Sequence, residues 1–279
     1  MRLRTLKTDG TACVALADGR LARVDRILEG APPNMLALLE SGLLTMLADA
    51  MDAGVDDSAC IDADAQIGAP WTRPRKILGI GLNYGAHAGD LGEQAPYTSP
   101  ASFLKGDHTI TGPGEPIIVP SGIGRVTAEA ELGLVIGRQC HRVGVDDAMA
   151  CVAGVVPVLD QTAEEVLLQN PRYLTRVKNY PTFFSFGPEL ITLDEVLAAG
   201  ALSDLRVATV HNGVVHREDT VSNMTFSPAE LLSFHSHVMP FYPGDILSTG
   251  TPGAVPIVPG DIVGCELGNV LASLANPVA

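Results

Sequence analysis

The chain has 279 residues, of which 46% are hydrophobic, and it carries a formal net charge of −14 at pH 7. This length and hydrophobic content suit one large domain, alone or with a small domain attached, and they exclude a chain that is disordered throughout. A strongly acidic chain lacks the basic surface that nucleic acids and anionic membranes require, so neither is expected as a partner. An anionic substrate must instead be attracted by a local positive group, such as a metal ion or a few lysines and arginines.

The cysteines and the N-terminal residues indicate the compartment. No two of the five cysteines form a Cys-x-x-Cys pair, which argues against a disulfide framework or a structural zinc site. No apolar run follows Met1, and no stretch approaches the ~20 apolar residues of a membrane span. We therefore expect a cytoplasmic protein with reduced cysteines.

Residues 1–70 form the first predicted unit. Alternating runs at 11–16 and 20–24 flank Asp18-Gly19 and predict a β-hairpin. Leucines and methionines at helical spacing over 34–51 predict a helix or a broken pair of helices, and the stretch 52–68 predicts a connecting loop. We expect a small α+β domain at 1–70 and a larger catalytic domain at 71–279.

The larger unit begins with an apolar strand at 77–82, which leads into a glycine-containing segment at 83–93. If that segment is helical, His87 and Asp90 lie three residues apart on one face. A histidine held by an acid can act as a general base, whereas a surface loop with an incidental histidine is the simpler interpretation.

Two carboxylates precede a buried strand predicted at 132–136. Residues two apart on a strand point to the same face, so Glu129 and Glu131 converge. Two like charges this close resist ionisation unless a cation lies between them, and hard divalent cations prefer oxygen ligands. The alternative is an edge strand with two solvated glutamates.

A second extended run, at 154–160, ends in Asp160. A carboxylate at the end of a buried strand is typical of a functional site, but the helix-forming residues that follow also allow Asp160 to be a helix N-cap. Further on, Arg172, Arg176 and Lys178 form a positive cluster in this acidic chain.

The C-terminal part contains short strands and turns. Asn212-Gly213 predicts a tight hairpin, and Ser227-Pro-Ala-Glu230 predicts a capped helix that runs to about residue 237. Many short strands and few long helices indicate a β-rich α+β fold. Further strands are predicted at 117–119, 244–247, 261–267 and 269–274.

Several short motifs follow one another between residue 75 and the end of the chain. They are Gly81-Leu-Asn83-Tyr84-x-x-His87, Phe103-x-Lys105, Glu129-Ala-Glu131-Leu132, Asp160, Lys178 with Thr182-Phe183, Gly187-Pro188, Phe226-Ser227, and Pro243-Gly-Asp245 followed by Thr249-Gly-Thr251-Pro252. In this order and spacing the set resembles the fumarylacetoacetate hydrolase family, in its shorter bacterial branch of acylpyruvate hydrolases and related isomerases. The resemblance implies a mixed β-roll in the C-terminal domain and a homodimer.

The resemblance also implies a metal-dependent site. Glu129, Glu131 and Asp160 are the implied ligands of Mg²⁺ or Mn²⁺, with Ca²⁺ able to replace them. The implied catalytic residues are His87, Asp90 and Lys178, and the implied substrate-binding residues are Tyr84, Lys105, Thr251 and Arg176.

The implied activity is metal-dependent hydrolysis of a C–C bond in a 1,3-diketo acid of the acylpyruvate or fumarylacetoacetate type, in aromatic or related carbon catabolism. Hydration, isomerisation or decarboxylation of a 2-oxo acid through a metal-stabilised enolate is the alternative. A catalytically weak binding protein on the same fold is a second alternative. Three departures from the family's pattern support the latter, namely Asp90 where Glu is common, Glu164 where Arg is frequent, and Pro181 where Asp is usual.

Overall fold

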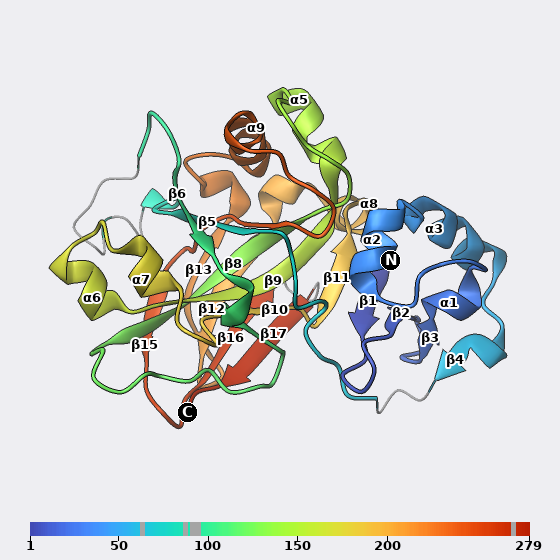
Figure 1. Cartoon of the computed structure of the whole chain (residues 1–279), viewed down its shortest axis with the longest axis horizontal. Coiled ribbons are helices and arrows are strands. Elements are labelled where there is room, and N and C mark those ends of the chain that lie inside the picture. Colours follow the sequence, from blue (N-terminus) through green and yellow to red (C-terminus); the bar gives the residue numbers. More distant parts are fainter. Residues whose placement is uncertain (62–64, 86–88, 90–95, 269–271) are drawn as a thin grey trace.

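A computed structural model of the chain describes residues 1–61, 65–85, 89, 96–268 and 272–279. A small N-terminal part lies beside a larger body built mainly of strands (Figure 1). The named strands of these residues belong to two sheets, one of thirteen strands and one of four. The predicted β-rich α+β fold is confirmed.

The N-terminal part agrees with its sequence pattern. Its elements are β1 (Arg2–Thr5), β2 (Ala12–Ala15), β3 (Leu21–Arg23), α1 (Val24–Ile27), α2 (Met35–Ser41), α3 (Leu44–Ala53), η1 (Asp57–Ala59) and β4 (Cys60–Ile61). The predicted hairpin is confirmed, because β2 and β3 pair antiparallel. The helix pair is broken at Gly42, which ends α2 in a left-handed conformation, and Asn34 caps its start by accepting from the Ala37 N–H.

The main sheet continues across the predicted domain boundary. β1 pairs antiparallel with β11 (Glu189–Thr192), so the N-terminal strands extend the sheet of the body. The order along this sheet is β4-β3-β2-β1-β11-β9-β8-β14-β5-β6. A division of the chain at residue 70 stays a prediction.

The body contains the remaining elements. The main-sheet strands are β5 (Ile77–Gly81), β6 (Ala101–Lys105), β7 (Ile110–Thr111), β8 (Val126–Ile136), β9 (Val152–Thr162), β10 (Phe184–Phe186), β14 (Ile246–Ser248) and β15 (Ala254–Ile257). The second sheet consists of β12 (Arg206–His211), β13 (Val214–Thr220), β16 (Ile262–Leu267) and β17 (Ala272–Pro277). The helices are η2 (Asp107–Thr109), α5 (Val145–Ala148), η3 (Met149–Cys151), α6 (Glu164–Gln169), α7 (Leu174–Lys178), α8 (Leu193–Ala199), η4 (Leu202–Asp204), η5 (Val221–Asn223) and α9 (Pro228–Val238).

β8 and β9 form the centre of the body. Each has eleven residues, and the two pair antiparallel with Glu129 opposite Asp160. Every residue of β8 is buried. The strand predicted at 132–136 is therefore only the second half of a longer strand, and the two glutamates lie inside it rather than at its start.

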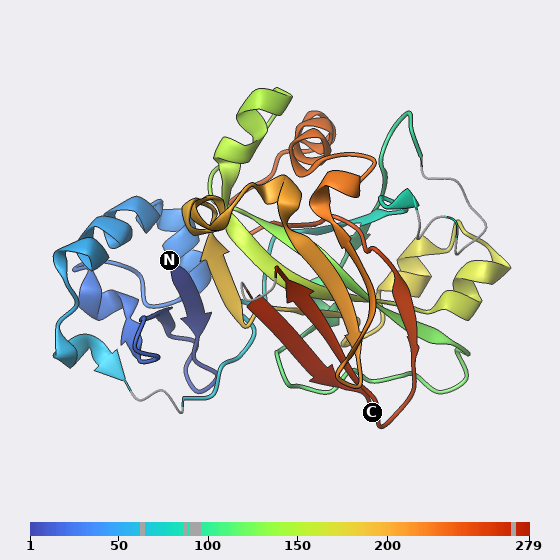
Figure 2. The same ribbon diagram turned by 180° about the vertical axis from the view of Figure 1, so that it is seen from behind.

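The second sheet packs against one face of β8 and β9 (Figure 2). Ala128, Ala130 and Leu132 of β8 belong to the same apolar cluster as Val207 of β12 and Cys265 of β16. Alternation along a strand then leaves Glu129 and Glu131 on the opposite face, away from the second sheet.

Other predictions in the body have mixed outcomes. The Asn212-Gly213 hairpin is confirmed by β12 and β13, and α9 begins with the predicted capping box of Ser227 and Glu230. The strand predicted at 117–119 is wrong, since Ile117 makes only an isolated bridge to Val278. Among the described residues, no helix is both long and apolar enough to cross a membrane.

Candidate metal centre

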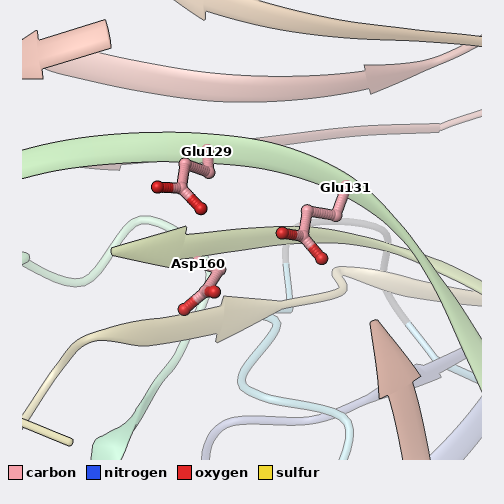
Figure 3. Close-up of side chains that lie close together, drawn as sticks. All are labelled: Glu129, Glu131 and Asp160. Atoms are coloured by element: carbon pink, nitrogen blue, oxygen red, sulfur yellow. The ribbon is translucent and has the colours of Figure 1, made fainter. Parts of the chain in front are cut away.

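Three carboxyl groups meet on the face of β8 and β9 that points away from the second sheet. Glu129 and Glu131 project from β8, and Asp160 projects from β9 toward them (Figure 3). One oxygen from each lies within 4.8 Å of the others. The residues are 8%, 1% and 0% exposed, so the alternative of two solvated glutamates on an edge strand is wrong.

The position of Asp160 excludes a role as a helix N-cap. Asp160 lies inside β9, and the N-cap residue of the following helix α6 is Ala163. The side chain of Asp160 therefore does not cap a helix and belongs to the carboxylate cluster.

Two lysine ammonium groups balance part of this charge. Lys178 Nζ donates to Glu129 Oε2 at 2.8 Å and to Asp160 Oδ2 at 2.6 Å. Lys105 Nζ donates to Asp160 Oδ1 at 2.6 Å and also to the Lys178 carbonyl. Both lysines are at most 5% exposed, and buried charges are tolerated only when they are paired in this way.

The carboxyl groups of the cluster outnumber its ammonium groups, three to two. Burial, together with the charge of Asp160, raises the pKa of Glu131 to about 8. Burial alone would lower the pKa of Lys178, but the charges of Asp160 and Glu129 outweigh it and hold that pKa above its usual range. The pKa of Lys105 is lowered, since burial and the neighbouring Lys178 outweigh its attraction to Asp160.

These features fit a divalent cation. The donors are all oxygens, as hard cations prefer, and an added double positive charge would oppose the burial and the repulsion from Asp160 that raise the pKa of Glu131. The site is therefore chemically suited to Mg²⁺ or Mn²⁺ bound by Glu129, Glu131 and Asp160.

Neighbouring hydroxyl and amide groups orient the carboxylates. Thr162 Oγ1 donates to Glu129 Oε1 at 2.6 Å. Glu131 Oε2 accepts from Ser248 Oγ at 2.5 Å and from the Gly250 N–H at 2.9 Å. Sequence reasoning missed the role of these three residues, because β9 and β14 become neighbours of β8 only through long-range pairing.

The loop after β14 is fixed by Asn83. Its amide Nδ2 donates to the carbonyls of Thr249 and Phe226 at 2.9 and 3.0 Å. Gly250 has a positive φ of 96°, and a Cβ there would lie 2.9 Å from the Asn83 side chain. Asn83 belongs to the motif Gly81-Leu-Asn83-Tyr84, and this motif was the signal in the sequence that could have indicated its role in fixing the loop.

The predicted substrate-binding residues occupy different environments. Lys105 belongs to the charged cluster, whereas the Thr251 hydroxyl bonds to the backbone of Gly253 in its own loop. Tyr84 is fully buried, and its hydroxyl has no hydrogen-bond partner among the described residues. Arg176 lies exposed on α7, and no ion pair joins it to another described residue. His87 and Asp90, the predicted catalytic pair, lie outside the described residues.

Glu164, which stands where arginine is frequent in the family, has a nearby ion-pair partner. The Arg125 Nε donates to a Glu164 carboxylate oxygen, so the two side chains form an ion pair. The negative charge that replaces the family's frequent arginine is therefore neutralised by a residue just before β8.

Comparison with known proteins agrees with the site. Residues 76–279 match the model of the fumarylacetoacetate (FAA) hydrolase C-terminal family. The chain belongs to this family. It is 33% identical to 2,4-didehydro-3-deoxy-L-rhamnonate hydrolase of a Sphingomonas species over 239 residues, 86% of this chain and 79% of that protein.

Two further similarities show the range of activities in the family. The human mitochondrial oxaloacetate tautomerase FAHD2A is 30% identical over 245 residues, 85% of this chain and 77% of that protein. The crystal structure of maleylpyruvate hydrolase from Sphingobium sp. SYK-6, in complex with manganese(II) and pyruvate, superposes with a TM-score of 0.80 at 27% identity, covering 100% of this chain and 99% of that one. Family members thus include hydrolases and a tautomerase.

Proposed function

We propose that this chain is a metal-dependent hydrolase that cleaves a C–C bond in a 1,3-diketo acid of the acylpyruvate type. The observation that carries the proposal is the buried cluster of Glu129, Glu131 and Asp160, balanced by Lys105 and Lys178. The manganese and pyruvate in the related maleylpyruvate hydrolase support the same type of ligand here.

Glu129, Glu131 and Asp160 would hold a Mg²⁺ or Mn²⁺ ion beside the 2-oxo acid end of the substrate. Such an ion would supply Lewis-acid stabilisation of the negative charge that develops on this end during cleavage. Lys178 holds two of the carboxylates in position, and its ammonium group also favours a developing oxyanion nearby. We assign Lys105 to holding Asp160 and limiting the net charge of the site.

Hydrolysis also needs an activated water. The water oxygen bonds to the distal carbonyl carbon, the bond from that carbon to the pyruvoyl methylene breaks, and the methylene gains a proton to give pyruvate. By the family motif we assign His87, held by Asp90, as the base that takes the proton from water.

The test is the loss of 1,3-diketone absorbance with a panel of acylpyruvates, with and without Mg²⁺ or Mn²⁺. We expect metal-dependent cleavage by the wild type and about 10²–10⁴-fold slower cleavage by His87→Ala, as for loss of a general base. His216→Ala removes an exposed histidine of β13 and serves as the control. Wild-type turnover in His87→Ala would exclude the assigned role.

Tautomerisation or isomerisation of a 2-oxo acid is the second candidate. It is favoured by the similarity to oxaloacetate tautomerase, and it requires proton transfer without an attacking water. Metal-dependent acceleration of the enol-to-keto conversion of oxaloacetate, with no cleavage of any acylpyruvate, would replace the hydrolase proposal by this one.

A further inference from the structure

The charged pair of Arg125 and Glu164 lies at the end of the β8–β9 ladder, near the carboxylates of its polar face. Glu129 is opposite Asp160, and Thr127 is opposite Thr162, two residues further along each strand. Arg125 is the residue just before β8, two positions before Thr127, so its side chain continues the face of Glu129. Glu164, the first residue of α6 after β9, pairs with it there.

The spacing suits the far end of a bound substrate. Four residues of strand correspond to about 13 Å between Glu129 and Arg125 along β8. An extended carbon chain advances about 3.5 Å for every three bonds. A diketo acid whose 2-oxo end lies at the carboxylates can therefore bring its tail within reach of the long Arg125 side chain.

The position of Arg125 is fixed by its neighbours. The Arg125 N–H donates to Glu165 Oε2 at 3.1 Å, and the Arg125 carbonyl accepts from the Glu165 N–H at 3.2 Å. The Glu165 carboxyl group also lies over Gly124, where an added Cβ would come within 2.0 Å of its Oε2. Only glycine fits at this point, so the backbone that presents Arg125 is held against α6.

The charges of the pair determine which tails it can accept. The Glu164 side chain is 14% exposed and that of Arg125 is 51% exposed, so the guanidinium is the more accessible partner. A substrate carboxylate that approached Arg125 would come next to the carboxylate of Glu164, and like charges at short range repel. A hydroxyl, amide or carbonyl group can bond to the pair without this repulsion.

We propose that Arg125 and Glu164 contact the substrate tail and select an uncharged, hydrogen-bonding tail over a second carboxylate. The preferred substrates are then monocarboxylic diketo acids with a polar neutral end. This inference rests on the proposed function, because it assumes that the 2-oxo acid end is held at Glu129, Glu131 and Asp160.

The test compares two substrates that differ only in the charge of the tail, namely succinylpyruvate and its terminal amide. With Mn²⁺ at low ionic strength, we expect the wild type to show a kcat/KM about tenfold higher for the amide. Glu164→Gln should bring the ratio of the two kcat/KM values, amide to acid, close to one, mainly through a lower KM for the acid. Arg125→Gln should increase the ratio, because it leaves the Glu164 charge unpaired. Glu29→Gln, the same change at an exposed residue of the N-terminal part, should leave the ratio unaltered.

The outcomes separate this inference from the proposed function. If both substrates are cleaved and Glu164→Gln does not change their ratio, the tail assignment is wrong and the hydrolase proposal stands. If neither is cleaved, the hydrolase proposal fails, and calorimetric binding of the same two molecules in the presence of Mn²⁺ decides the tail assignment. Tighter binding of the amide by the wild type, lost in Glu164→Gln, would support it, and equal binding or no binding would overturn it.

Discussion

The two faces of the β8–β9 ladder carry opposite chemistry on one backbone. On the face toward the second sheet, Ala128, Ala130 and Leu132 pack into the apolar core. On the other face, Glu129 and Glu131 stand beside Asp160 and its lysine partners. Both faces are buried, so the comparison shows that period-two alternation, rather than exposure, separates the core from the site.

The largest predicted effect tests whether the carboxylates of the polar face need their lysine partners. Lys178→Met leaves Glu129 and Asp160 without their shared ammonium group, and breaking a buried ion pair costs about 3–5 kcal/mol of the free energy of unfolding. Urea unfolding in the presence of a chelator measures this loss. We also expect Mn²⁺ to stabilise the variant more than the wild type, because the variant has one more uncompensated negative charge.

The control for Lys178 is Lys7→Met. Lys7 pairs with Glu115 at the surface, and such pairs contribute about 0–1 kcal/mol. Equal losses in the two variants would show that the cluster is not maintained by its lysines.

On the face toward the second sheet, the free energy of unfolding should depend on side-chain volume instead of charge. Ala130→Leu adds atoms between β8 and the second sheet, where Ala130 is 0% exposed and its N–H donates to Thr209 Oγ1. Overpacking of this kind costs about 1–3 kcal/mol of the free energy of unfolding, measured by urea denaturation. Ala201→Leu at an exposed position is the control, and an unchanged midpoint for Ala130→Leu would contradict close packing of the two sheets.

The smallest predicted effect concerns a polar residue on the packed face. Gln161 is 0% exposed, and its Oε1 and Nε2 have no hydrogen-bond partner among the described residues. Gln161→Met removes this unsatisfied group and should raise the free energy of unfolding by about 1 kcal/mol.

Asn276 provides the matched comparison for Gln161. It is equally buried, but it accepts from Ser185 Oγ and donates to the carbonyls of Gly112 and Glu115. Asn276→Leu should therefore destabilise the protein by about 1–3 kcal/mol. If Gln161→Met destabilised it as much, Gln161 must have partners in the folded protein.

Local patterns in the sequence predicted much of this arrangement. Glu-x-Glu in an apolar run predicted two convergent carboxylates, and Asn212-Gly213 and the Ser227 capping box predicted their hairpin and helix. Alternation and capping depend on near neighbours in the chain, so these features could be inferred from residue order. The joint role predicted for Glu129, Glu131 and Asp160 came from family resemblance, and the structure shows that their carboxyl groups lie close together.

Features that depend on long-range register could not be inferred. The strand at 132–136 extends back to Val126 because Thr127 and Glu129 find partners on β9. Ser248 and Gly250 reach Glu131 only because β14 pairs with β8, and the main sheet crosses residue 70 because β1 pairs with β11. The Arg125–Glu164 ion pair likewise joins residues 39 positions apart.

We propose above all that Glu129, Glu131 and Asp160 bind a divalent cation. Calorimetric titration with Mn²⁺ tests it most directly, comparing the wild type with Glu131→Gln, which keeps the shape of the side chain but removes its ability to ionise. We predict one bound ion per wild-type chain and at least a tenfold loss of affinity in the variant, with Glu29→Gln unaffected. No binding by the wild type, or equal binding by Glu131→Gln, would contradict the account.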